Sequence, residues 1–267
     1  MVVLENIDKS FGPKKVIQNL SLEVGEGEIF TLLGESGCGK TTLLRLVAGF
    51  LQPDGGRILI ENEDMLSLPV ERRPVGFIFQ NHALFPHLSV YDNIAVGPRI
   101  RNVPEKETRK QIDALLEAAR IQDLKQAYPN QISGGESQRV AIVRAVVNRP
   151  KVLLLDEPLS SLDPGLRQSL REELVEMQKT FGLTFFFVTH DQEEALSLST
   201  RIGILESGRL LQVGPPAELY DRPKTPYIAQ FLGEVNPLRG GVVRQSGSRV
   251  SIQIDGGGLI HCDSREP

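Results

Sequence analysis

The residues best suited to chemistry form a glycine-rich stretch, GESGCGKTT, from Gly34 to Thr42. It follows an apolar run and precedes a segment with helical periodicity, which is the context that a phosphate-binding loop requires. Glycines let backbone N–H groups converge on phosphate oxygens, and the next helix directs its positive end at the same anion. Lys40 is placed to bridge β- and γ-phosphates and Thr41 to coordinate Mg²⁺. A plain glycine-rich turn gives no reason for Lys and Thr at this offset.

Two adjacent carboxylates, Asp156 and Glu157, end the apolar run 152–155. If this run is a strand of a parallel sheet, its carboxyl end lies beside the phosphate-binding loop. Asp156 is then suited to hold Mg²⁺ through water, and Glu157 to polarise an attacking water. The pair alone is equally consistent with an acidic turn, so the interpretation depends on the glycine-rich loop.

Two further polar residues stand where apolar runs end: Gln80 after 75–79 and His190 after 184–188. A lone histidine more often closes a turn, and a single glutamine carries little weight. Both gain interest because the carboxyl ends of parallel strands share one edge of a sheet. There His190 is expected to hydrogen-bond a γ-phosphate.

A second phosphate cradle lies in QISGGESQRV, where Ser133, Gly134 and Gly135 open a helical run. Ser133 and Glu136 match the capping-box pattern, in which the Glu side chain reaches back to the N-cap N–H. Two helix N-termini can enclose one triphosphate only if they come from different chains or lobes. The residues alone leave open why one chain carries two such cradles.

Hydrophobic periodicity predicts the elements that position these groups. Residues 1–30 alternate apolar and polar positions, as antiparallel strands do. From residue 28 short apolar runs alternate with helical patterns, which is typical of a parallel sheet covered on both faces. Helical patterns such as 105–119 dominate from 81 to 131. Residues 236–267 return to short β-like pieces, too few for an independent core.

Composition narrows the class of protein. The 267 residues are 40% hydrophobic with a net charge of −4, which does not suggest a nucleic-acid surface. Two cysteines are too few for a disulfide framework, so a reducing compartment is expected. The N-terminus lacks the apolar core of a signal peptide. No apolar run approaches the ~20 residues that span a bilayer, so any membrane role is expected to be peripheral.

In this order the motifs resemble those of the nucleotide-binding subunits of ATP-binding-cassette (ABC) transporters, from Leu4 to about Gly233. The resemblance implies an α/β fold, a P-loop NTPase cassette over 1–235, with a mixed sheet, an antiparallel N-terminal β subdomain and a helical subdomain over about 81–135. It implies ATP contacts from Phe11, Gly34, Ser36, Gly37, Cys38, Gly39, Lys40, Thr41, Thr42 and Gln80, and Mg²⁺ contacts from Thr41, Gln80 and Asp156. Glu157 and His190 are the implied catalytic residues. Phe11 takes the place of the aromatic residue that stacks on adenine, although alone it would more often be a strand residue.

In this family two cassettes associate head to tail, with each ATP between one P-loop and the partner's signature motif. Ser133, Gly134, Gly135 and Glu136, together with Asp163 of the D-loop (Ser160–Asp163), are therefore expected to contact the nucleotide of a second copy. The family's usual residue at 136 is glutamine. A carboxylate there should cost some ATP-dependent dimer affinity unless it points away from the phosphate.

The segment 79–94 resembles importer ATPases, in which it docks a short helix of the membrane subunit; Leu84 and Phe85 suit such a groove, or else pack within the helical insertion. Residues 145–150 and 233–236 most resemble spermidine/putrescine (polyamine) importers, while ferric-iron, sulfate, molybdate and sugar importers share the other motifs. The resemblance implies a homodimer peripheral to the cytoplasmic face of the inner membrane, with two permease subunits and a solute-binding protein.

Residues 236–267 resemble the start of an OB-like (TOBE-type) regulatory domain, which is expected to be short or truncated. Two other classes remain open. Soluble ABC ATPases that act in translation or repair usually carry two cassettes or a long coiled coil. A regulatory module with little turnover would not require Glu157 and His190.

Overall fold

The structure, a computed structural model, describes residues 1–80, 83–160 and 164–263, without the side chains of 164–166. The chain forms two compact units, Met1–Arg222 and Pro223–Pro267. The boundary predicted at 235–236 thus falls inside the second unit, because the helix α8 (Pro226–Leu232) groups with the residues that follow it.

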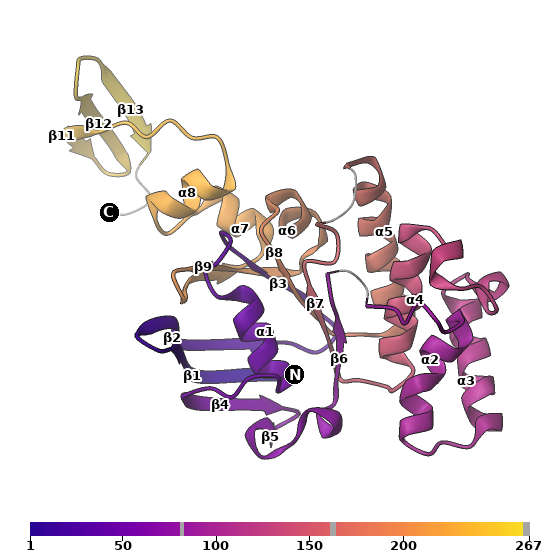
Figure 1. The fold of residues 1–267 in the computed structure, drawn as a ribbon. Coiled ribbons are helices and arrows are strands. Elements are labelled where there is room, and N and C mark those ends of the chain that lie inside the picture. The colour runs from indigo at the N-terminus through magenta and orange to yellow at the C-terminus, as the bar shows by residue number, and fades with distance from the viewer. Residues whose placement is uncertain (81–82, 161–163, 264–267) are drawn as a thin grey trace. The chain divides into compact units, whose positions relative to one another are not determined.

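A sheet of six described strands organises the larger unit, in the order β10-β9-β3-β8-β7-β6 (Figure 1). Its strands are parallel except β10, which runs antiparallel to β9. They are β3 (Ile29–Leu33), β6 (Val75–Ile78), β7 (Val152–Asp156), β8 (Phe185–Thr189), β9 (Arg201–Glu206) and β10 (Arg209–Gly214). The runs expected as parallel strands are β3, β6, β7 and β8, each within one residue. β9 and β10 were not predicted.

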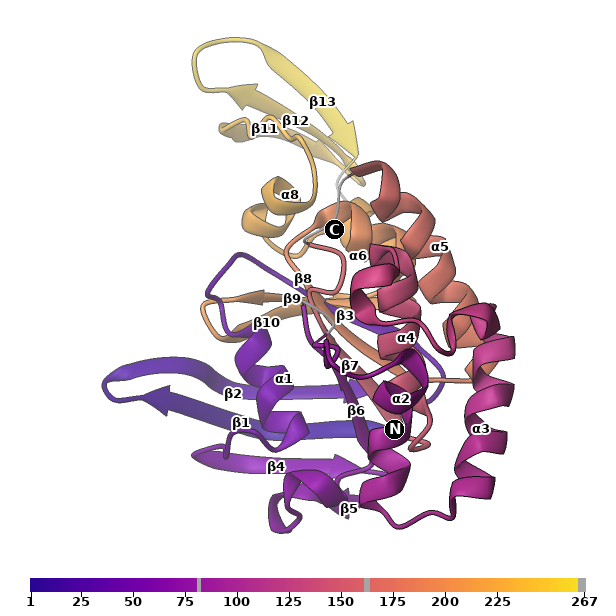
Figure 2. The same cartoon turned by 45° about the vertical axis from the view of Figure 1, so that its right-hand side comes forward.

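A second, antiparallel sheet has the order β2-β1-β4-β5. Its strands are β1 (Val2–Phe11), β2 (Lys14–Val24), β4 (Gly55–Ile60) and β5 (Glu63–Asp64). The predicted antiparallel pairing of residues 1–30 is confirmed, with Val2 opposite Val24. Helix α1 (Lys40–Ala48) lies between the two sheets (Figure 2), and its leucines share one core with residues of both.

Strand alternation divides the interior into two cores. In β8, Phe186 and Val188 face the core that contains α1, whereas Phe185 and Phe187 face the helices on the other side. Leu154 and Leu155 of β7 divide in the same way. Both faces of these strands are buried, as expected for a parallel sheet covered on both faces.

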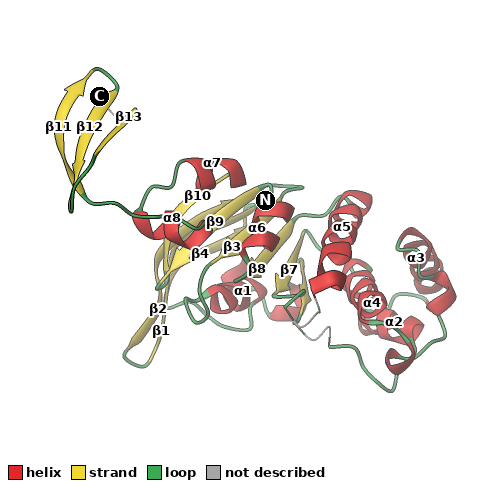
Figure 3. Ribbon diagram, turned by 90° about the horizontal axis from the view of Figure 1, so that it is seen from above, coloured by secondary structure: helices red, strands yellow, loops and turns green. Residues whose placement is uncertain are grey.

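The helices on the second face are α2 (Val90–Ile100), α3 (Glu105–Ala118), α4 (Gly134–Val146) and α5 (Pro164–Phe181). They gather on one side of the larger unit (Figure 3). The predicted helix at 105–119 is α3, and no strand occurs among the described residues between 83 and 131. The short helices α6 (Gln192–Leu198) and α7 (Pro216–Asp221) complete this unit.

The smaller unit contains α8 and the antiparallel strands β11 (Gly240–Ser246), β12 (Arg249–Ile254) and β13 (Leu259–Asp263). In the three strands most side chains are exposed, and Val250 is their buried apolar residue, whereas α8 buries Ile228 and Leu232. Across the described parts of both units, no helix combines the length and apolarity needed to cross a bilayer.

Candidate active site

The glycine-rich loop connects the buried strand β3 to α1, as its sequence context predicts. Gly37 and Gly39 adopt left-handed backbone angles, with φ of 82° and 115°. A Cβ atom on Gly39 would lie 2.8 Å from Ile17 Cδ1 and 2.9 Å from the Val16 carbonyl oxygen. Only glycine fits this position, which is the last before α1.

Lys40 extends its side chain back under the loop and is 4% exposed. Its ammonium donates to the carbonyl oxygens of Gly34, at 2.7 Å, and Glu35, at 2.8 Å. The positive charge is therefore held against the backbone of the glycine-rich loop. The neighbouring Cys38 is buried, and this burial raises the pKa of its thiol, so it stays protonated.

An open cavity of about 360 Å³ adjoins the loop. Its lining residues are Phe11, Lys14, Val16, Ser36, Gly37, Gly39, Lys40, Thr41, Thr42 and Glu157. Phe11 ends β1 and leaves 47% of its surface exposed, while the Lys9 ammonium lies 5.6 Å from the ring centroid. Lys14 and Val16 were not predicted; only the pairing of β1 with β2 brings them to the loop.

Thr41, in the first turn of α1, contacts Asp156, the last residue of β7. The Thr41 hydroxyl donates to Asp156 Oδ1 at 2.8 Å. Burial raises the pKa of Asp156, and the Thr41 hydrogen bond opposes this shift. A hydroxyl beside a partly buried carboxylate suits Mg²⁺, which takes few protein ligands in addition to phosphates and water. Among the described residues, no group of three or more His, Cys, Asp or Glu side chains is arranged so that it could hold a metal ion.

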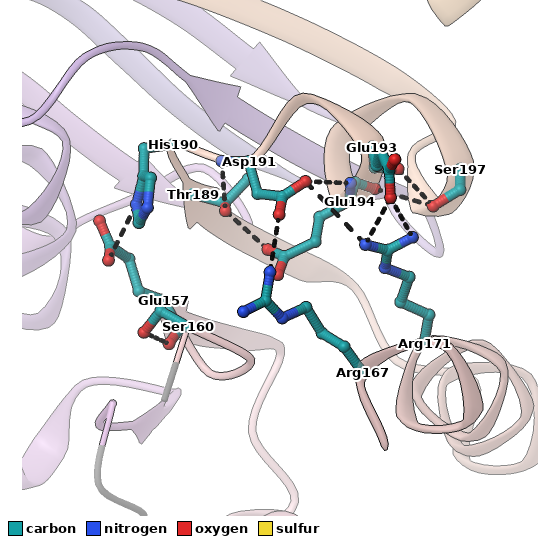
Figure 4. A network of polar contacts seen from close by, with 10 residues as sticks. All are labelled: Glu157, Ser160, Arg167, Arg171, Thr189, His190, Asp191, Glu193, Glu194 and Ser197. Atoms are coloured by element: carbon teal, nitrogen blue, oxygen red, sulfur yellow. Dashed lines mark hydrogen bonds and ion pairs between the residues drawn. The ribbon is translucent and has the colours of Figure 1, made fainter. Parts of the chain in front are cut away.

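Glu157 turns out of β7 with a positive φ of 47°, unusual for a non-glycine residue. Its N–H donates to the Val188 carbonyl at 3.0 Å, which continues the pairing with β8. Its Oε2 lies 3.2 Å from His190 Nδ1, with the two side chains 20% and 48% exposed (Figure 4). The structure thus brings the two predicted catalytic residues together.

Gln80 is connected to Glu157 through Ser160, a D-loop residue that was not predicted to belong to the site. The Gln80 amide donates to Ser160 Oγ at 2.8 Å, and this hydroxyl donates to the Glu157 carbonyl oxygen at 2.9 Å. A serine in a loop carries no signal strong enough to have identified this contact. Asp163 lies outside the described residues.

The second cradle begins α4, where Ser133 and Glu136 form the predicted capping box. Glu136 Oε2 accepts from the Ser133 N–H and from its hydroxyl, both at 2.8 Å. These hydrogen bonds lower the pKa of Glu136. The described residues that line the cavity beside Lys40 include none of 133–136.

A phosphate-binding loop, a paired hydroxyl and carboxylate, and a Glu–His pair at one edge of a parallel sheet define a P-loop nucleotide-binding protein. Residues 17–160 match the family described as ABC transporter, and the chain belongs to this family as an ATP-binding protein.

A curated relative from Marinobacter nauticus, named "Spermidine/putrescine import ATP-binding protein PotA", is 49% identical over 97% of this chain and 69% of its own length. A relative of the same name from Vibrio cholerae is 47% identical over 96% of this chain and 68% of its own length. A solved structure of cbiO1 from Clostridium perfringens, described as part of the ABC transporter complex cbiONQ, superposes with a TM-score of 0.76 at 32% identity. It covers 83% of this chain and 90% of the other.

Proposed function

We propose that this chain hydrolyses ATP as the motor subunit of a polyamine importer and works as a head-to-tail dimer. The observation that carries the ATPase proposal is the convergence of Lys40, the Thr41–Asp156 pair and the Glu157–His190 pair. The solute is inferred from the relatives named for spermidine and putrescine.

The residues divide the chemistry of hydrolysis. Phe11 offers an exposed ring for the base, and the loop N–H groups with Lys40 bind and neutralise phosphate oxygens. Thr41 and Asp156 would hold Mg²⁺, which supplies charge neutralisation when bound. Glu157 accepts the proton of the attacking water. His190, which lies 3.2 Å from Glu157, is assigned to hydrogen-bond the γ-phosphate.

The dimer follows from the second cradle. Ser133 to Glu136 present a helix N-terminus, an arrangement that binds anions, yet they do not line the described cavity of their own chain. A second copy placed head to tail supplies each P-loop with this helix. ATP then holds the dimer closed, and hydrolysis releases it.

We expect Glu136→Gln to preserve ATP-dependent dimerisation or strengthen it by up to about fivefold, because a charge is removed beside the partner's triphosphate. A glutamine oxygen can still accept from the Ser133 N–H, so the helix start is retained. The dimer dissociation constant is measured by sedimentation in ATP, with both chains also carrying Glu157→Gln to suppress turnover.

Salt provides the control, since an electrostatic gain shrinks as ionic strength rises. In the chain with Glu157 intact, ATPase activity should persist after Glu136→Gln. A clear loss of that activity would show that the carboxylate has a specific task and would contradict the proposed role.

Exposed apolar rings support docking to a permease. Phe50, Phe77 and Phe79 cluster, with the Phe77 and Phe79 centroids 4.5 Å apart, and both Phe50 and Phe79 are exposed. Phe85 is also exposed, beside Arg144, whereas Leu84 packs against the core. Of the two residues expected in a docking groove, Phe85 is therefore the better candidate. We propose two permease subunits and a solute-binding protein as partners, and with them a peripheral place on the cytoplasmic face of the inner membrane.

The decisive experiment reconstitutes this chain in proteoliposomes with the permease subunits and binding protein encoded beside it. We expect ATP-dependent uptake of radiolabelled spermidine or putrescine, absent with Glu157→Gln. Uptake of ferric iron, sulfate, molybdate or a sugar instead would overturn the polyamine proposal and keep the importer. ATP-stabilised dimers without phosphate release, even with the partners present, would favour a regulatory module.

A further inference from the structure

The backbone of His190 is anchored from both sides, although its ring is half exposed. The preceding residue, Thr189, donates its hydroxyl to Glu194 Oε2 at 2.6 Å and accepts from the Asp191 N–H at 3.0 Å. Glu194 is buried, so this anchor is protected from water. Hydrogen bonds of its two neighbours therefore restrain the segment that carries the His190 ring, which points toward Glu157 (Figure 4).

Asp191, the residue that follows His190, connects two helices. Its Oδ1 accepts from the Glu194 N–H at 3.0 Å and so caps α6. Its Oδ2 accepts from Arg167 Nη1 of α5 at 3.1 Å. One carboxylate thus fixes the end of the His190 segment to α6 and, independently, to α5.

The contact with α5 is reinforced one turn further along. Arg171 lies four residues after Arg167 and therefore on the same face of the helix. Its Nη2 lies 4.0 Å from Asp191 Oδ1 and 3.3 Å from Glu193 Oε2. The side chains of Arg167 and Asp191 are 25% and 23% exposed, so solvent and salt weaken their ion pair less than they weaken a fully exposed pair.

We propose that the Arg167–Asp191 ion pair is a positioning device for hydrolysis: it holds the segment 189–191 so that His190 stays against Glu157. This rests on the proposed roles of Glu157 and His190. Neither Arg167 nor Asp191 lines the described cavity, so the pair acts on the chemical step and leaves nucleotide binding unchanged. Small displacements of catalytic groups have large effects on rate.

Asp191→Asn tests the proposal because asparagine caps helices about as well as aspartate but cannot form the ion pair. Arg167→Gln breaks the same pair from α5 and leaves the cap intact. For each variant we expect kcat for ATP to fall about tenfold while KM changes less than about twofold. Arg167→Lys, which keeps the charge, should recover most of kcat. The matched control is Glu176→Gln, which also changes a residue of α5 but breaks its exposed ion pair with Arg120. This variant should leave kcat unchanged.

The double variant separates positioning from general damage. If the two residues act through one another, Asp191→Asn with Arg167→Gln loses no more kcat than either single change. Multiplicative losses in the double variant, unchanged kcat in both singles, or a rise in KM with kcat retained would each overturn the proposal. Thermal unfolding of each variant shows that it is folded; if Asp191→Asn is not, Arg167→Gln and Arg167→Lys decide. Hydrolysis by Glu157→Gln at the wild-type rate would instead remove the proposed role of Glu157, and this inference with it.

Discussion

Replacing Glu157 by glutamine is expected to lower kcat for ATP hydrolysis by about 10²- to 10³-fold, because an amide cannot accept the proton of the attacking water. Binding should persist, since the loop and Lys40 are untouched. Glutamine can also contact His190 Nδ1, which lies 3.2 Å from Oε2 of the present carboxylate, so we expect the local geometry to be conserved. Without turnover, ATP accumulates at the interface and the closed dimer becomes the main species.

Two measurements on the same sample check this result: phosphate release and the mass of the species by light scattering with ATP present. Glu71→Gln, which changes an exposed carboxylate that does not line the cavity, serves as the control and should behave as wild type. Hydrolysis by Glu157→Gln at the wild-type rate would remove Glu157 as the group that polarises water.

Lys40→Ala is expected to raise the Kd for ATP by about thirtyfold or more. The change removes charge-assisted hydrogen bonds to phosphate, each worth about 1.5–3 kcal/mol. It also leaves the carbonyl oxygens of Gly34 and Glu35 without the ammonium that binds them at 2.7 and 2.8 Å. The glycine-rich loop should therefore lose rigidity as well as charge.

Titration with a fluorescent ATP analogue measures this effect, and thermal unfolding separates lost binding from lost folding. Lys151→Ala removes a lysine whose side chain is 56% exposed and paired with Glu61, so it should leave the Kd unchanged. An unaltered titration curve for Lys40→Ala would contradict the assignment of the loop as a phosphate cradle.

Much of the site could be predicted from sequence because its parts are local. The loop from Gly34 to Thr42 requires glycine at positive φ and a helix directly after it, and both are encoded within a few residues. The Ser133–Glu136 capping box is local in the same sense, and the structure has it as predicted. The first and last residues of β3, β6, β7 and β8 could be predicted because each strand is a short apolar run.

β9 and β10, which extend the sheet beyond β3, were not predicted because their sequence pattern is weak. Their pattern, interrupted by Gly203 and by the turn at Ser207 and Gly208, is weaker than the runs of the central strands. Lys14 and Val16 belong to the cavity only because strand pairing brings β2 next to the loop. Nothing in their own neighbourhood of the sequence indicates this.

By itself, the sequence determined the phosphate-binding loop, the capped second cradle and the order of the strands' polar ends, because local periodicity and turn chemistry decide these features. Tertiary structure alone decided which polar ends touch: Thr41 with Asp156, Glu157 with His190, and Gln80 with Ser160. It also joined Asp191 to Arg167 of α5. The physical reason is that these contacts join residues far apart in the chain, and their distances follow from sheet order and helix packing, which no local pattern encodes.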